Sequence, residues 1–407
     1  MRVLVVGSGG REHAVAWKLA QSPRLTELHA APGNPGIAAL GVCHPVRAED
    51  AEGLLALSHA IGIDLVVIGP EAPLVAGVAD ALRHGGVAVF GPSAAAARIE
   101  GSKRFAKEVL QAAGVPTADA LAVARPPCVV KADGLAAGKG VFVCRTQEQL
   151  DDALRAVSGL GEDFVVEELL EGEELSVFAL CDGVRALGLA PARDFKRAFD
   201  GDEGPNTGGM GAFSPVPLAG VDAAEIVETV HEPVLRELAE RGAAFIGLLY
   251  AGLMLTQSGP RVLEFNCRFG DPETQAILPR VDGDLLGALA AAAAGDLGST
   301  TLATGEDAAV TVVVAARHYP ADGDTGTPIE GIADAEAQGA WVFHAGTALR
   351  GDRLVTNGGR ILAVTAGGPT VADARTRAYA AAEAIRFDGA RFRRDIALEA
   401  ASGAPVG

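Results

Sequence analysis

The sequence predicts a multidomain chain of the α/β and α+β classes, and three observations lead to that prediction. The chain has 407 residues, which is enough for two to four domains. Over residues 1–100, short apolar stretches that end in glycine turns alternate with helical segments, which is typical of a doubly wound parallel sheet. The rest of the chain lacks this alternation, and its last part, residues 309–407, reads as a small α+β region.

The composition indicates which kinds of binding partner the protein has and in which compartment it works. The chain is 49% hydrophobic and 21% charged, as ordinary globular proteins are. Its net charge of −18 argues against nucleic acid and against anionic membranes, since both attract basic surfaces. The five cysteines are scattered and never spaced C-x-x-C, which favours a reducing compartment. Because the first strand follows Met1 directly, with no signal peptide, we expect a cytoplasmic protein.

The amino-terminal elements come first. We expect strands at Val3–Val6, Asp64–Ile68 and Val87–Phe90, another strand ending at Ala31, and a helix over 11–20. Each strand leads into a glycine or proline loop, and such loops form the binding crevice of a parallel sheet.

This region does not match a dinucleotide fingerprint. After Gly7 and Gly9, the position of the third glycine is Glu12, and the second strand is followed by Asn34 rather than by an acid. Two interpretations stay open for the turn at 9–11. It binds a single phosphate with its backbone N–H groups, or it is a tight turn that binds no ligand.

The segment Val129–Val143 reads as a hairpin with a mobile loop. The loop holds Gly134, Gly138 and Gly140 with two lysines, but a strand follows it, so it is not a Walker A loop. A helix is expected before it, from residue 100 to about 113. Such a hairpin can close over a nucleotide with its lysines on the phosphates, and an ordinary mobile hairpin is the alternative.

Three further polar stretches follow. The strand Phe164–Val166 leads into the acidic run 167–174, which can meet an adenine edge and a ribose or can be a solvated turn. Residues 193–197 form a cationic loop around Asp194. The glycine-rich loop 204–211 presents backbone N–H groups to a ligand.

The segment Arg261–Thr274 carries the most specific pattern. On its strand, Glu264 and Asn266 are two residues apart and therefore share a face. A carboxylate and a carboxamide without His or Cys form a hard oxygen site, which suits Mg²⁺ when phosphates complete the shell. Arg268 follows with a planar fork for a carboxylate or phosphate. A polar strand end with a solvated arginine is the alternative interpretation.

The C-terminal region is expected to contain strands at 309–315, 341–344 and 360–364 and a helix over 371–385. We predict no chemical role for it.

Together these motifs resemble the glycinamide ribonucleotide synthetase family of the ATP-grasp superfamily. The segments that carry the resemblance are GGREHA (9–14), GPEAPL (69–74), EGSK (100–103), KADGLAAGKGV (131–141), GPNTGGMGA (204–212), GLLYAGLM (247–254), EFNCRFGDPET (264–274) and VTNGGR (355–360). The resemblance implies an ATP-grasp fold. Its domains would be an amino-terminal doubly wound domain at 1–100, a central ATP-grasp domain at 101–118 and 185–308, a flap at 119–184, and a C-terminal α+β domain at 309–407.

The resemblance also implies an activity. ATP, glycine and 5-phosphoribosylamine would give glycinamide ribonucleotide, ADP and phosphate through glycyl phosphate, in de novo purine synthesis, with Mg²⁺ or Mn²⁺. Neither nucleic acid nor a membrane takes part. A monomer is expected, with a dimer as the alternative.

The resemblance assigns site residues position by position. The metal ligands would be Glu264 and Asn266, and the residues with catalytic roles would be Arg268, Lys131 and Asp194. The residues that would bind ATP are Lys103, Lys131, Gly134, Gly138, Lys139, Gly140, Glu167, Glu168, Leu170 and Glu174. The residues that would bind the other substrates are Gly9, Gly10, Asn34, Glu71, Asp194, Gly208, Gly209, Met210, Gly211, Arg268 and Asp271.

Three positions depart from the family pattern. Phe195 stands where the family often has histidine, the segment 117–129 is short, and residues 251–253 lack the additional acidic metal ligand of many superfamily members. Three alternative functions stay open: another ATP-grasp carboxylate–amine ligase, a nicotinamide-dependent oxidoreductase, and a non-catalytic nucleotide-binding regulator.

Overall fold

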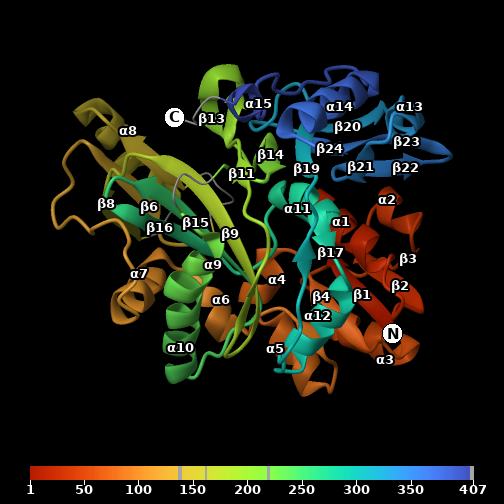
Figure 1. Ribbon diagram of the computed structural model, residues 1–407, viewed down its shortest axis with the longest axis horizontal. Helices are drawn as coiled ribbons and strands as arrows, with labels where there is room; N and C mark the ends of the chain where they lie inside the picture. Colours follow the sequence, from red (N-terminus) through yellow and green to blue (C-terminus); the bar gives the residue numbers. More distant parts are fainter. Residues whose placement is uncertain (136–139, 161–162, 218–220, 404–407) are drawn as a thin grey trace.

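A computed structural model describes residues 1–135, 140–160, 163–217 and 221–403. Its amino-terminal part is a parallel sheet in the order β3-β2-β1-β4-β5 (Figure 1). On β1, Val3 and Val5 belong to one core cluster and Leu4 and Val6 to another, so both faces of the strand are covered. The doubly wound sheet is therefore confirmed. Its strands are β1 Arg2–Gly7, β2 Glu27–Pro32, β3 Val42–Cys43, β4 Leu65–Ile68 and β5 Val89–Phe90.

Helices follow these strands. They are α1 Gly10–Leu19, α2 Pro35–Ala38, α3 Ala51–Ile61, α4 Glu71–Val75, α5 Val78–His84, α6 Ala94–Gly101 and α7 Lys103–Ala112. The single helix expected from residue 100 is wrong, because the chain breaks at Ser102. Ser102 is extended, and its hydroxyl accepts the N–H of Phe105 and so caps α7 while ending α6.

The flap is a small three-stranded antiparallel sheet, in the order β7-β6-β8, with one helix packed on it. In Figure 1, α8 lies at the opposite end of the molecule from the amino-terminal sheet. The described residues between Thr117 and Cys128 contain no helix. Of the loop residues predicted to close over ATP, Gly138 and Lys139 lie outside the described residues. The elements are β6 Cys128–Ala132, β7 Val141–Cys144, α8 Gln147–Leu160 and β8 Phe164–Glu168.

The central sheet is antiparallel, in the order β10-β9-β15-β16. Its long strand β15 pairs with β16, and Gly252 lies opposite Glu264. The strands are β9 Glu173–Asp182, β10 Ala186–Gly188, β15 Ile246–Thr256 and β16 Gly259–Asn266. Helices near this sheet are α9 Ala223–Ile226, η2 Val227–His231, α10 Glu232–Glu240 and α12 Leu285–Ala293.

A third sheet joins the central and C-terminal parts of the chain, in the order β11-β14-β19-β24-β21. Two of its strands end before residue 308 and three begin at or after it, so the sheet crosses the expected domain boundary. The boundaries themselves remain predictions. The strands are β11 Arg193–Asp194, β14 Gly211–Ser214, β19 Ala308–Ala315, β21 Trp341–His344 and β24 Arg360–Gly368.

Short elements complete the fold. They are β12 Arg197–Phe199, η1 Asp200–Asp202, β13 Glu203–Asn206, α11 Glu273–Ile277, η3 Leu278–Arg280, β17 Val281–Asp282, β18 Ala303–Thr304, β20 Asp324–Pro328, α13 Ile332–Ala337, β22 Thr347–Arg350, β23 Arg353–Gly358, α14 Val371–Ala384 and α15 Leu398–Ser402. Among the described residues, no helix has the length and apolar character to cross a bilayer.

Candidate active site

Two cavities meet beneath the flap. The first, of about 1100 Å³, lies among the flap, the central sheet and the C-terminal segment, and the second, of about 260 Å³, extends toward the amino-terminal sheet. Six residues line both: Val141, Asp194, Lys196, Thr207, Tyr250 and Glu264. This shared wall is where a group could pass from a ligand in one cavity to a ligand in the other.

Lys131 lines the first cavity, where β6 pairs with β8. Its ammonium group lies 2.7 Å from a Glu167 carboxylate oxygen and donates to the Leu263 carbonyl at 2.8 Å. The other oxygen of Glu167 lies 3.0 Å from the ammonium of Lys107. Both oxygens of this buried carboxylate are thus paired, so Glu167 fixes Lys131 in the structure, and its predicted contact with adenine stays a prediction.

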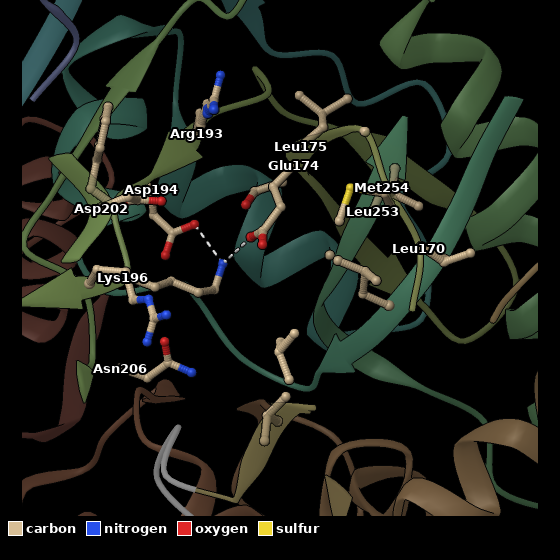
Figure 2. Close-up of a pocket in the computed structure, with 18 of the residues that line it drawn as sticks. Leu170, Glu174, Leu175, Arg193, Asp194, Lys196, Asp202, Asn206, Leu253 and Met254 are labelled. Carbon is tan, nitrogen blue, oxygen red and sulfur yellow. Dashed lines mark hydrogen bonds and ion pairs between the residues drawn. The ribbon is translucent and has the colours of Figure 1, made fainter. Parts of the chain in front are cut away.

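Lys196 extends along the shared wall between two carboxylates, as Figure 2 shows. Its ammonium group lies 2.8 Å from Asp194 and 2.9 Å from Glu174. Burial alone would lower the pKa of Lys196, but Asp194 and Glu174 raise it well above its usual range, so the lysine stays charged. Lys196 lowers the pKa of Glu174, and burial raises that of Asp194.

Glu264 and Asn266 end β16 and both line the second cavity. Burial would raise the pKa of Glu264, but Lys103, Lys196 and Lys131 outweigh it, and the group stays ionised. The nearest of these ammonium groups, that of Lys103, is 3.9 Å away. No described group hydrogen-bonds the side-chain amide of Asn266, so it is free to meet a ligand.

These two side chains fit a divalent cation as part of a larger shell. Within the described ranges, no cluster of three His, Cys, Asp or Glu side chains could hold a metal by itself. Gly252, opposite Glu264, provides no additional acid. A cation bound here would therefore need phosphate oxygens or water for its other ligands, which is how Mg²⁺ binds beside nucleotides.

Each of the three nitrogens of the Arg268 guanidinium group has a partner in the protein. Nε lies 3.2 Å from Glu71, Nη2 lies 3.4 Å from Glu100, and Nη1 donates to the Phe269 carbonyl at 3.2 Å. Glu100 also accepts the N–H of Cys267 at 2.7 Å. Burial would raise the pKa of Glu71, but Arg268 and Arg11 outweigh it and lower that pKa to about 2. The second N–H of Nη1 and of Nη2 is left for a ligand.

The turn at 9–11 is filled by a side chain of the protein. The buried Glu12 carboxylate accepts the N–H of Gly9 at 2.6 Å. The Asn34 amide donates to the carbonyls of Ser8 and His344, each at 2.8 Å, and its oxygen caps α2. In this conformation these groups serve the protein's own structure, and their roles toward phosphoribosylamine remain predictions.

The structure brings most of the other predicted site residues to the cavities. Those lining the first are Lys131, Glu167, Glu168, Leu170, Glu174, Asp194 and Glu264. Those lining the second are Glu71, Lys103, Gly134, Gly140, Asp194, Gly208, Glu264, Asn266, Arg268 and Asp271. Those described residues that line neither are Gly9, Gly10, Asn34, Gly209, Met210 and Gly211.

Sequence reasoning missed seven polar residues of the second cavity: Arg11, Glu100, Lys196, Thr207, Tyr250, Glu273 and Arg360. Lys196 stands in the cationic loop and the other six stand within quoted motifs, so the motif segments held the signal. Arg360 comes from the C-terminal part, for which the sequence predicts no chemical role, and it lines this cavity.

A flap sheet over a central antiparallel sheet, with lysines, paired acids and a Glu-x-Asn strand end between them, defines the ATP-grasp ligase class. Three family descriptions match consecutive parts of the chain: "Phosphoribosylglycinamide synthetase, N domain" over residues 1–100, "ATP-grasp (A) domain" over 101–274, and "C domain" over 309–399. The chain belongs to the phosphoribosylglycinamide synthetase family.

Relatives of known name agree with this assignment. The phosphoribosylamine–glycine ligase of Streptomyces coelicolor is 52% identical over 98% of this chain and 100% of its own length, and that of Mesorhizobium japonicum is 49% identical over 98% of each. The crystal structure of the Thermotoga maritima phosphoribosylamine–glycine ligase superposes with a TM-score of 0.83, at 35% identity, over 97% of this chain and 100% of that one.

A more distant structure shares the fold. The biotin carboxylase domain of Hydrogenobacter thermophilus 2-oxoglutarate carboxylase, solved with MgADP, ADP and bicarbonate, has a TM-score of 0.69 at 18% identity. It covers 96% of this chain and 91% of its own.

Proposed function

We propose that this chain is an ATP-dependent carboxylate–amine ligase that joins glycine to 5-phosphoribosylamine, giving glycinamide ribonucleotide, ADP and phosphate. The observation that carries the proposal is the wall shared by the two cavities, with Lys196 and Glu264 on it and Arg268 beyond it. The relatives named above, which match the chain over nearly its full length, support it. The product is a precursor in de novo purine synthesis.

ATP would occupy the first cavity. Leu170, Leu175 and Leu253 give that cavity an apolar part for the base (Figure 2), and Glu174 is placed for the ribose hydroxyls. Lys131 and Lys196 would then face the phosphates. Phosphoryl transfer needs alignment and charge neutralisation more than a protein nucleophile, and the ammonium groups of Lys131 and Lys196 would supply the positive charge.

Glycine would enter the second cavity with its carboxylate on the two remaining N–H groups of Arg268. A carboxylate oxygen attacks the γ-phosphorus, and the bond to the β-phosphate oxygen breaks, which gives glycyl phosphate and ADP. Because Glu71 and Glu100 hold the guanidinium on its other edges, Arg268 keeps one orientation during this step.

Phosphoribosylamine completes the reaction. Its amine attacks the acyl carbon, the C–O bond to phosphate breaks, and the departing phosphate takes up the proton that the amine nitrogen loses. Asp194 and Asp271 line the second cavity and are placed to hold the amine and the ribose hydroxyls. Glu264 and Asn266 would hold Mg²⁺ or Mn²⁺, which supplies charge neutralisation on the phosphates when bound.

ADP release by the full chain with glycine alone, phosphoribosylamine alone, and both together tests the proposal. We expect turnover only with both substrates. Turnover that does not depend on glycine would assign the chain to another carboxylate substrate, and NAD(H) binding in a fluorescence titration would favour the oxidoreductase alternative.

The setting of this reaction is also a proposal. The five cysteines lie in described parts of the chain and are all free, which agrees with a reducing cytoplasm. We propose that the enzyme works there as a monomer, and sedimentation at micromolar concentration would detect a dimer.

A further inference from the structure

The C-terminal part of the chain reaches the second cavity through Arg360, and the proposed function gives this residue no role. Arg360 begins β24, directly after the turn at Gly358–Gly359. It lines the cavity, and its side chain is 21% exposed, so it stands at the edge of the site rather than on the protein surface.

The guanidinium of Arg360 joins two loops that form one side of that cavity. Nη1 donates to the carbonyl of Gly208 at 2.5 Å and to the carbonyl of Asp271 at 2.7 Å. Nη2 pairs with the Asp271 carboxylate at 3.0 Å. One side chain therefore fixes both the glycine-rich loop and the start of the segment that leads into α11.

Tyr319 holds the same glycine from its other side. Its hydroxyl oxygen accepts the N–H of Gly208 at 2.8 Å. The carbonyl and the N–H of Gly208 are thus both bonded to residues that follow residue 308, and no secondary structure holds this peptide otherwise.

The close fit requires glycine on both sides of the contact. A Cβ atom added to Gly208 would lie 3.0 Å from Cζ of Arg360, and one added to Gly359 would lie 2.4 Å from the Tyr319 ring. Both motifs, GPNTGGMGA and VTNGGR, contribute to this one contact.

The contact between Arg360 and Gly208 is supported by a β-sheet. β24 and β14 both pair with β19 in one sheet, as Figure 1 shows, and β14 begins three residues after Gly208. Because the sheet fixes β24 relative to β14, Arg360 and Tyr319 can hold the loop in a single position.

We propose that Arg360 and Tyr319 are positioning residues that shape the second cavity for the acceptor amine. This inference rests on the proposed function, because it assigns that cavity to phosphoribosylamine. The C-terminal part of the chain would thereby decide how the amine meets the acyl phosphate, while ATP binding in the first cavity would not depend on it.

The experiment compares wild type with Arg360→Gln and Tyr319→Phe in full-length protein, with the Michaelis constants for ATP, glycine and freshly prepared phosphoribosylamine measured separately. We expect Arg360→Gln to raise the constant for phosphoribosylamine at least tenfold and Tyr319→Phe to raise it about threefold. The constant for ATP should stay within twofold in both. Hydrogen–deuterium exchange at residues 207–211 should be faster in both variants.

Arg377→Gln is the matched control, because Arg377 is an exposed arginine of the same region and donates only to the Gly367 carbonyl. It should leave every constant unchanged. Equal rises of the ATP and phosphoribosylamine constants, or faster exchange with an unchanged phosphoribosylamine constant, would overturn the proposal. If wild type itself failed to use glycine and phosphoribosylamine, the proposed function would fail first, and the exchange data would still test the contact.

Discussion

At the scale of single residues, the site is a set of charges that hold one another in place. Arg268 is fixed by Glu71, Glu100 and a carbonyl, and Lys196 is fixed by Asp194 and Glu174. A charged group that is already oriented needs no reorganisation when a substrate arrives, which is the condition for strong transition-state stabilisation. The same pairing means that a substitution at one of these residues also disturbs its partners.

Arg268→Lys is expected to lower kcat/KM for glycine at least about 100-fold. A lysine ammonium group cannot pair with Glu71 and Glu100 and also offer two parallel N–H groups to the glycine carboxylate. The thermal midpoint should shift by only a few degrees, because charge is retained. Steady-state kinetics and thermal unfolding check this, with the exposed Arg236→Lys as control. Glycine kinetics within twofold of wild type would remove Arg268 as the carboxylate-binding residue.

Glu264→Gln is expected to lower turnover at least about 100-fold at any Mg²⁺ concentration, since a metal ligand worth several kcal/mol is lost while side-chain volume is kept. Glu240→Gln, an exposed acid at the end of α10, is the control. Activity measured across a Mg²⁺ titration decides the matter. Recovery of near-normal turnover at saturating Mg²⁺ would show that the metal assignment is wrong.

At the scale of elements, a buried carboxylate is one of the links between the flap and the central part of the chain. Glu167 on β8 pairs with Lys131 on the neighbouring strand and with Lys107 on α7. The structure thereby links the position of the flap sheet to a lysine that lines the first cavity.

Glu167→Gln should destabilise the protein by about 3–5 kcal/mol, because the buried ammonium group of Lys131 and the partly buried one of Lys107 lose their counter-ion. The Michaelis constant for ATP should rise as Lys131 loses its fixed position. Urea unfolding and ATP kinetics measure the two effects. Glu171→Gln, three residues after β8 and 80% exposed, should change neither. An unchanged unfolding free energy for Glu167→Gln would mean that the pairs do not stabilise the flap.

At the scale of the whole molecule, histidines join the amino-terminal and C-terminal parts. His13 on α1 accepts the backbone N–H of His344, the last residue of β21, at 2.8 Å. Burial, with a smaller effect of His344, lowers the pKa of His13 to about 3, and burial lowers that of His344 to about 4. Both rings therefore stay neutral in the folded protein at pH 5, whereas an unfolded chain with an ordinary histidine pKa near 6.5 is protonated.

Stability should consequently fall as the pH drops through this window, because the unfolded state binds protons that the folded state excludes. Between pH 7 and pH 5, His13 alone accounts for a loss of about 2 kcal/mol. His13→Asn, which keeps an acceptor near Nδ1, should remove that part of the pH dependence. His59→Asn, on the surface of α3, should keep it. Urea unfolding at both pH values gives the comparison, and equal slopes for wild type and His13→Asn would contradict the prediction.

A structural feature can be predicted from the sequence when the residues that form it are close together in the chain. The Glu264–Asn266 pair follows from the strand period alone, and the flap strands and the parallel sheet follow from apolar runs with glycine turns. The break at Ser102 was missed because a capping residue inside a helical pattern looks like any polar residue. The pairing of Glu167 with two lysines could not be read from an acidic run, because one of them, Lys107, comes from a helix 60 positions earlier.

The sequence by itself determined the fold class and the ATP-grasp motifs, and most of the site residues it predicted line the cavities, since each depends on periodicity or on a contiguous segment. Only the tertiary structure decided that Glu71 and Glu100 hold Arg268 and that Arg360 from the C-terminal part borders the second cavity. These contacts join residues that are far apart in the sequence: 197 positions separate Glu71 from Arg268, and 152 separate Gly208 from Arg360. No local pattern specifies them, because they form only when separately folded elements pack and leave two charges within about 3 Å of each other.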